Sequence, residues 1–147
     1  MKYCSTRGGV SELNFDDAVM MGLAEDGGLL IPQELPSIGE KLKGWRSLTY
    51  QDLCLEVTDL FVGESFDRSE LKAMIQRSYA SFRTSTITPL VPVSSIHVLE
   101  LFHGPTFAFK DVALQLLGNL FESLLNKKGE RLRILGCLLY TSDAADE

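Results

Sequence analysis

The stretch Glu100–Asp111 joins two sequence patterns that belong to different kinds of secondary structure. The apolar run over residues 96–101, which ends at a Gly-Pro turn, predicts a β-strand. Beyond Asp111 apolar residues recur every three or four positions, which predicts a helix over residues 107–126 with a wide buried stripe and Thr106 as its cap. The chain therefore turns sharply from strand to helix here, and Lys110 lies in the first turn of the predicted helix.

Lys110 is an unusual choice for this position on structural grounds alone. A cation near a helix N-terminus faces the positive end of the helix dipole, which costs about 0.3–1 kcal/mol, and Phe107 and Phe109 offer little water to an ammonium group. Both effects favour the neutral amine, the form that attacks a carbonyl carbon. The alternative is a structural lysine whose stem covers apolar surface while Asp111 balances its charge, and the residues alone favour that alternative.

The segment after the predicted helix suggests the fold class. A charged turn over residues 127–130 is followed by a predicted strand over 131–135. Strand, helix and strand form one crossover unit, which implies a parallel sheet in an α/β domain. A single unit cannot cover both faces of its sheet. We therefore expect residues 84–136 to be the start of an α/β domain, incomplete in this chain, and the polar residues 83–86 to link it to a smaller leading domain, residues 1–83.

Within residues 1–83 the pattern predicts short strands and amphipathic helices. A capping residue opens each of the first two helices, and an acid-Gly-Gly turn precedes the second strand. The predicted elements are a strand at 3–4, a helix opened by Asn14, the turn Asp26–Gly28, a strand at 29–31, a helix over 49–62 opened by Thr49, and a helix over 68–82. No catalytic residues are grouped on these helices, so their apolar faces are expected to form core and docking surface.

Composition narrows the possible functions. The net charge is -6, and no basic patch with interleaved aromatic residues is present, which argues against a nucleic-acid partner. No stretch approaches the ~20 apolar residues of a membrane span, and the first residues lack the apolar core of a signal peptide. The three cysteines are scattered and match neither a disulfide framework nor a metal site. We therefore expect a cytoplasmic protein without a metal.

Three segments resemble one enzyme family. The stretch Leu99–Asp111 is similar to the cofactor-lysine segment of threonine synthases and threonine-synthase-like phospholyases. Tyr3–Gly8 resembles the family's opening strand, and Gly22–Pro32 resembles its turn and second strand. The segments follow the family's order and spacing from residue 2 to about residue 136. The resemblance implies the N-terminal part of a tryptophan-synthase-β-like (fold type II) enzyme that depends on pyridoxal 5'-phosphate (PLP).

The resemblance also implies roles for individual residues. Lys110 would be the catalytic lysine that carries PLP. His103 could touch the substrate or cofactor, although a structural hydrogen bond is an equal alternative, and Arg7 is a candidate for binding the substrate's phosphate. Asp111 is expected to orient the helix start or pair locally, and Phe107 and Phe109 to keep water from the site. The implied reaction converts O-phosphohomoserine and water to threonine and phosphate.

The sequence departs from the family after Gly136, where a Ser/Thr/Gly-rich phosphate loop is expected. Residues 137–147 contain no glycine and are expected to be a non-native, adapter-like tail, so this chain alone is expected to be inactive. Two alternatives stay open: a phospholyase acting on another phosphorylated amino compound, and a non-catalytic interaction module. The sequence does not predict the oligomeric state.

Overall fold

The computed structural model describes residues 1–134, so the predicted tail, residues 137–147, lies outside the described residues. The described part contains five helices and two separate two-stranded sheets. The elements are β1 (Tyr3–Ser5), α1 (Phe15–Met21), β2 (Leu30–Pro32), α2 (Leu42–Trp45), α3 (Tyr50–Val62), α4 (Arg68–Tyr79), β3 (Leu90–Val93), β4 (Ile96–Leu99) and α5 (Asp111–Lys128). No helix in this part is both long and apolar enough to cross a membrane.

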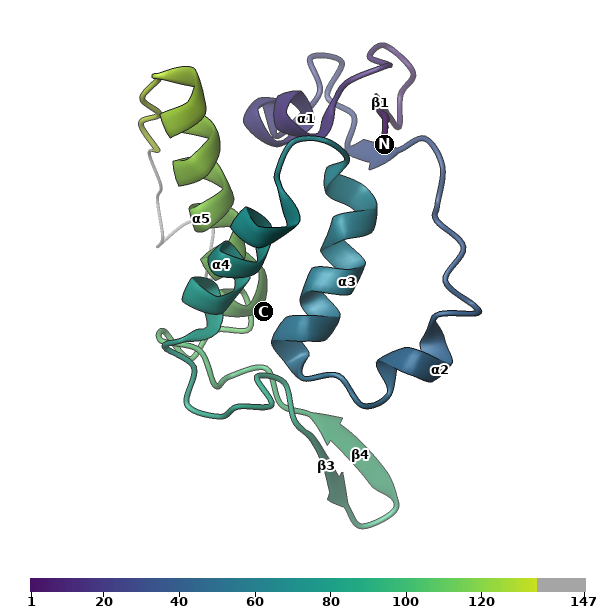
Figure 1. Ribbon diagram of the computed structural model, residues 1–147, viewed down its shortest axis with the longest axis vertical. Coiled ribbons are helices and arrows are strands. Elements are labelled where there is room, and N and C mark those ends of the chain that lie inside the picture. The colour runs from purple at the N-terminus through teal and green to yellow at the C-terminus, as the bar shows by residue number, and fades with distance from the viewer. Residues whose placement is uncertain (135–147) are drawn as a thin grey trace.

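Three helices form the centre of the molecule (Figure 1). Helix α4 packs against α3 on one side and α5 on the other. The apolar faces predicted for α3 and α4 form the core, joined by the stripe of α5; its members include Leu55, Val62, Leu71, Met74, Ile75, Leu120 and Leu124. Because α5 contributes to this core, the two expected units share one interior. The boundary after residue 83 stays a prediction.

The two capping predictions have different outcomes. At α3 the Thr49 hydroxyl accepts a hydrogen bond from the Asp52 backbone N–H at 3.1 Å and donates to the Asp52 carboxylate at 2.7 Å, as predicted. Helix α1 does begin after Asn14, but the Asn14 side chain makes no capping bond. Its Oδ1 accepts a hydrogen bond from Lys2 Nζ at 2.8 Å instead. The capping role predicted for Asn14 is therefore wrong, because a neighbouring cation takes up its acceptor.

The predicted parallel crossover is also wrong for the described residues. Strand β4 pairs antiparallel with β3, in a segment expected to be linker, and residues 131–134 form no strand. Two residues, Ser94 and Ser95, connect the strands, and Ser94 adopts a positive φ of 55°, as short hairpin turns require. A two-residue connection can join only antiparallel neighbours. Within residues 1–134, β4 therefore pairs with the strand that precedes it, and no parallel pairing is formed.

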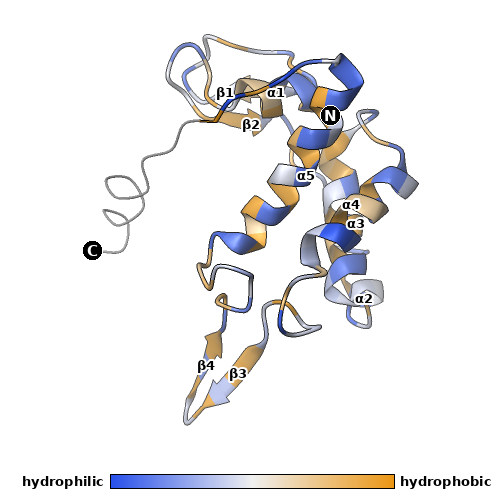
Figure 2. Cartoon of the chain, turned by 90° about the vertical axis from the view of Figure 1, so that its left-hand side faces the viewer, coloured by the Kyte–Doolittle hydropathy of each residue, from blue (hydrophilic) through white to orange (hydrophobic). Residues whose placement is uncertain are grey.

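The β3–β4 hairpin projects from the helices at the end opposite to β1 and β2 (Figure 1). Apolar residues cover both strands (Figure 2). Most are strongly exposed within the described part of the chain, including Leu90 at 61%, Ile96 at 59% and Leu99 at 54%. The hairpin therefore adds little to the core, and its place in the fold is set by the segments that flank it.

Candidate active site

Lys110 lies at the end of the loop that runs from β4 to α5. It is the residue immediately before α5, with φ -60° and ψ -24°, so it precedes the first helical turn by one residue. Its Nζ lies 5.6 Å from the centre of the Phe109 ring. Among residues 1–134, Nζ has no ion-pair or hydrogen-bond partner. The amine is therefore held at a helix start without being neutralised by Asp111.

The buried carboxylate of Asp111 holds the loop through hydrogen bonds. Asp111 is only 3% exposed. Its Oδ2 accepts hydrogen bonds from the backbone N–H of Thr106 at 2.8 Å and from the Thr106 hydroxyl at 2.9 Å, and its Oδ1 accepts one from Gln115 at 3.3 Å. Thr106 was expected to cap the helix and instead bonds back to Asp111. The expectation that Asp111 pairs locally agrees with this geometry, because both carboxylate oxygens are engaged.

Gly104 is packed against this carboxylate. The residue is buried, and a Cβ built on it would lie 2.7 Å from Asp111 Cγ and closer still to Asp111 Cβ and Oδ2. Real Cβ atoms do not approach other atoms within 3.0 Å. The close approach of loop and helix therefore requires glycine at this position.

Arg83, which lies outside the loop in the sequence, also contacts it. Its backbone N–H donates to the His103 carbonyl at 3.0 Å, and its Nη1 donates to the Gly104 carbonyl. Its guanidinium carbon lies 3.8 Å from the centre of the Phe107 ring. Phe107 has a positive φ of 64°, which for a bulky residue costs about 1–3 kcal/mol. Stacking of an exposed cation on an aromatic ring stabilises the structure by roughly 0.5–1 kcal/mol, so the Arg83 contact offsets part of the strain at Phe107.

His103 belongs to this loop but is already paired. Its Nε2 lies 2.6 Å from Oε2 of Glu100, and the two side chains are 19% and 25% exposed. The imidazole also packs near Phe102, with ring centres 4.6 Å apart. The structure therefore gives His103 the structural hydrogen bond that the sequence left open. A role toward a substrate stays a prediction.

Arg7 is engaged in the turn between α1 and β2. Its Nη1 donates to the Asp26 carbonyl at 2.9 Å. The Asp26 carboxylate accepts hydrogen bonds from the Ser5 hydroxyl at 2.7 Å and from the backbone N–H groups of Gly28 and Gly9, both at 2.8 Å. These bonds, the one from Ser5 first, lower the pKa of Asp26, with a smaller contribution from the Arg7 charge. Arg7 and Asp26 together therefore hold the first sheet to its turn.

The structure does not bring Arg7 and Lys110 together. The β1–β2 sheet lies beside α1, and Asp17 of α1 pairs with Lys128 at the last turn of α5, at 3.5 Å (Figure 1). Lys110 lies at the other end of α5, and 18 helical residues span about 27 Å. The arginine beside the Lys110 loop is Arg83, which sequence reasoning assigned to a linker. The sequence around Arg83 does not indicate this role, because the residues that Arg83 contacts lie 20 or more positions away.

The aromatic side chains of the loop face outward. Phe107 is 62% and Phe109 54% exposed within residues 1–134. Neither side chain excludes water from Lys110 in this part of the chain, so the expected shielding is absent here. Together with the hairpin they leave one end of the molecule apolar.

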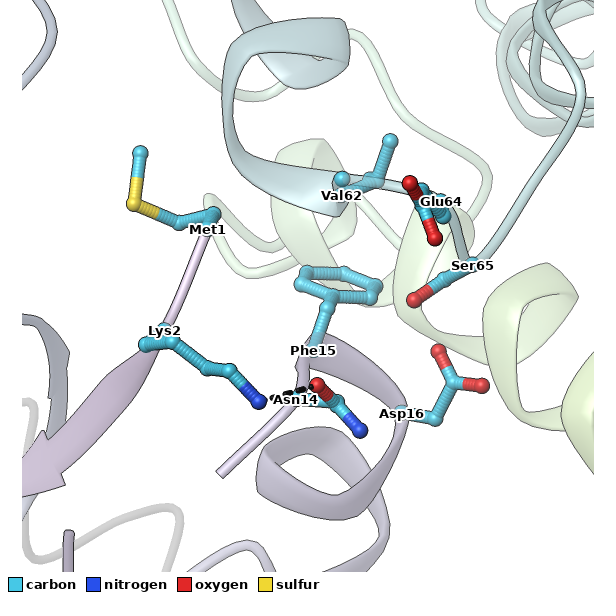
Figure 3. A pocket seen from close by; sticks show the side chains of 9 residues that line it. Met1, Lys2, Asn14, Phe15, Asp16, Val62, Glu64 and Ser65 are labelled. Carbon is cyan, nitrogen blue, oxygen red and sulfur yellow. Dashed lines mark hydrogen bonds between the residues drawn. The ribbon is translucent and has the colours of Figure 1, made fainter. Parts of the chain in front are cut away.

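One pocket lined by polar groups lies at the N-terminal end of the chain, away from Lys110. A pocket of about 460 Å³ opens between the N-terminal residues, the start of α1 and the α3–α4 turn (Figure 3). Asn14 and Asp16 line it from α1, and Glu64 and Ser65 from the turn. Asp16 Oδ1 is buried and has no hydrogen-bond partner among the described residues. No group of three or more metal-ligating side chains occurs there or elsewhere in residues 1–134.

Comparison with known proteins gives a consistent result. The family model described as threonine synthase N terminus matches residues 2–79. The threonine synthase of Schizosaccharomyces pombe is 48% identical over 131 residues, which is 87% of this chain and 26% of that protein. Threonine synthase-like 2 of Xenopus laevis is 38% identical over 138 residues, 92% of this chain and 29% of that protein.

A solved structure matches the fold as well. The PLP-bound threonine synthase from Brucella melitensis superposes with a TM-score of 0.85 at 44% identity, covering 89% of this chain and 29% of that one. The predicted fold class, the N-terminal part of a PLP-dependent fold type II enzyme, is therefore confirmed. The chain spans less than a third of the length of the proteins it matches. It belongs to the threonine synthase family and corresponds to the N-terminal part of its members.

Proposed function

We propose that this chain is part of a PLP-dependent lyase, a threonine synthase, and that Lys110 is the residue that carries the cofactor. The observation that carries the proposal is the Lys110 amine, unpaired among residues 1–134 and held at the start of α5 by a loop that Asp111 braces. Its support from relatives is 48% identity to a threonine synthase and the likeness to a PLP-bound one.

The residues present fit the aldehyde end of PLP. An aldehyde condenses with a primary amine, and the Lys110 Nζ has no ion-pair or hydrogen-bond partner among residues 1–134. The exposed ring of Phe109, whose centre lies 5.6 Å from Nζ, offers apolar surface beside that amine. When bound, PLP supplies an electron sink next to the substrate carbon that bears the amino group.

The proposed reaction converts O-phosphohomoserine and water to threonine and phosphate. The β-carbon loses a proton and the γ-carbon gains one, the bond between the γ-carbon and the phosphate oxygen breaks, and water gives its hydroxyl to the β-carbon and its remaining proton to the released phosphate. The Lys110 amine, placed at the loop end, would take a proton from one substrate carbon and deliver it to another. His103, paired with Glu100, would orient the loop or touch the substrate. Arg7, whose Nη1 donates to the Asp26 carbonyl at 2.9 Å, stays a predicted candidate for the substrate's phosphate.

A second candidate function is a phospholyase that eliminates phosphate from another phosphorylated amino compound. The 38% identity to Threonine synthase-like 2 of Xenopus laevis supports it. For the full-length protein, threonine as the product supports a threonine synthase, whereas a keto product with phosphate supports a phospholyase. The third possibility, a non-catalytic interaction module, and the expected cytoplasmic location stay predictions.

The test is covalent trapping of PLP. The chain is incubated with PLP, reduced with borohydride, digested, and analysed by mass spectrometry. We expect a pyridoxyl group on Lys110 in preference to Lys72, an exposed lysine whose amine lies 3.8 Å from Asp52. Lys110→Ala should abolish that label and leave the remaining lysines unchanged. Labelling spread evenly over the surface lysines, with no preference for Lys110, would contradict the proposal.

A further inference from the structure

The loop that carries Lys110 is fixed from two sides. Asp111 holds Thr106 from the helix side through two hydrogen bonds. On the opposite side Arg83 contacts the loop through its backbone, its guanidinium donor and its guanidinium face, and at the loop's start the Glu100 N–H donates to the Pro89 carbonyl at 2.9 Å. Arg83 follows the end of α4 and belongs to a different segment of the chain.

Each Arg83 contact constrains a different part of the loop. The backbone N–H fixes the His103 carbonyl, Nη1 fixes the Gly104 carbonyl, and the guanidinium covers the Phe107 ring. The Gly104 carbonyl also accepts the Phe107 N–H at 3.3 Å, so Nη1 and this turn converge on one oxygen. Phe107 is the residue with positive φ in this loop, three positions before Lys110.

Arg83 carries its charge without a carboxylate partner among the described residues. A surface arginine with a purely electrostatic structural role would be expected to face an acid, as Arg68 does with Glu56 and Asp59. The Arg83 guanidinium instead faces a backbone carbonyl and an aromatic ring. The planar guanidinium can make both contacts at once, because an N–H on its edge donates to the carbonyl while its face stacks on the ring.

We propose that Arg83 is a positioning residue for Lys110: it links the end of α4 to the loop and holds that loop in the conformation that presents the amine. The inference rests on the proposed function of Lys110. Arg83 acts through Gly104 and Phe107 and does not itself touch the reacting atoms.

The test compares Arg83→Met with Arg83→Lys and Arg77→Met. Arg77 is a matched control, because it is an exposed arginine near the same end of α4 whose Nε donates to Asn119 of α5 at 3.2 Å, away from the loop. We expect trapping of PLP at Lys110 to fall about tenfold or more in Arg83→Met, since small misplacement of a reacting group costs factors of this size. Arg83→Lys, which keeps a cation and a donor, should restore part of the labelling, and Arg77→Met should label as the wild type does.

A second readout does not depend on PLP. Hydrogen exchange measured on the peptide that contains residues 104–110 should speed up in Arg83→Met, while exchange in α3 and the melting temperature stay near the wild-type values. Faster exchange with slower trapping supports the proposal. Unchanged exchange, or trapping equal to wild type in Arg83→Met while Lys110→Ala loses it, overturns the positioning role and leaves the proposed function intact. Failure of the wild type to label Lys110 counts against the proposed function, and the exchange measurement then decides the role of Arg83 in the loop.

Discussion

Replacing Gly104 by alanine should destabilise the protein far more than replacing Gly118 by alanine, although both changes add one methyl group. Gly104 is buried against Asp111, and its Cβ would lie 2.7 Å from Asp111 Cγ. Gly118 lies on the exposed face of α5, and a Cβ there meets nothing within 4 Å. The pair therefore separates the effect of packing at the Lys110 loop from the effect of glycine itself.

The magnitude follows from what must move. Forcing a methyl group into a packed site costs about 1–3 kcal/mol. Moving the loop away from Asp111 also weakens the two hydrogen bonds from Thr106 to a buried carboxylate, and bonds to charged groups contribute about 1.5–3 kcal/mol. We expect Gly104→Ala to lower the free energy of unfolding by about 3–5 kcal/mol. Gly118→Ala should raise it by roughly 0.5–1 kcal/mol, because alanine favours the helix.

The assay is urea unfolding followed by circular dichroism, with thermal melts as a second measure. For a chain of this size, the Gly104→Ala loss corresponds to a melting temperature lower by about 10 °C. Equal stability of Gly104→Ala and wild type would refute the contact between loop and helix. A loss in Gly118→Ala as large as that in Gly104→Ala would show that glycine flexibility, and not the contact with Asp111, decides the outcome.

Two further changes test the elements around the site. Because hydrogen bonds lower the pKa of Asp26 in the folded protein, its ionised form stabilises the fold above the ordinary carboxyl pKa of about 4, and this stabilisation is lost as pH falls through the lowered value. The stability difference between wild type and Asp26→Asn in urea unfolding should therefore be larger at pH 6 than at pH 3, and a difference independent of pH would contradict this account. Thr49→Ala removes the capping bond of α3 and should cost about 1 kcal/mol in the same assay, whereas an unchanged midpoint would show that the cap is dispensable.

Helices α3 and α4 could be predicted because their signals are local, whereas α2 was not predicted and α5 begins at Asp111 and not at the predicted residue 107. Helix α3 has its capping residue, its acid and its apolar stripe within one stretch of sequence, and the structure begins and ends it at Tyr50 and Val62, within one residue of the prediction. The turn at Asp26 could also be predicted from the sequence, since Gly27 adopts the positive φ of 74° that the acid-Gly-Gly pattern indicates.

The hairpin could not be predicted, because its sequence does not identify β3 as the partner of β4. The run at 96–101 reads as a strand, and the following helix pattern favours a crossover to a third strand. The antiparallel pairing of Val91 with Val98 depends instead on a turn at Ser94. That turn contains no glycine or asparagine, the residues that usually indicate a two-residue hairpin turn. A short apolar run identifies a strand without identifying its neighbour.

The candidate site shows the same division between local and long-range information. Lys110 stands out from its own neighbours, because a cation at a helix start among phenylalanines contradicts local preference. Arg7 follows the end of a strand and Arg83 follows the end of a helix. The neighbouring residues do not indicate that Arg83 contacts the Lys110 loop while Arg7 contacts the distant Asp26 turn. Only the path of α5 decides between them: its first residue lies at the Arg83 loop, and its last turn pairs with α1, which lies beside the sheet that holds Arg7. The proposed cofactor lysine is thus indicated by its local chemistry together with the family resemblance, whereas the arginine proposed to position it is found from the contacts between segments.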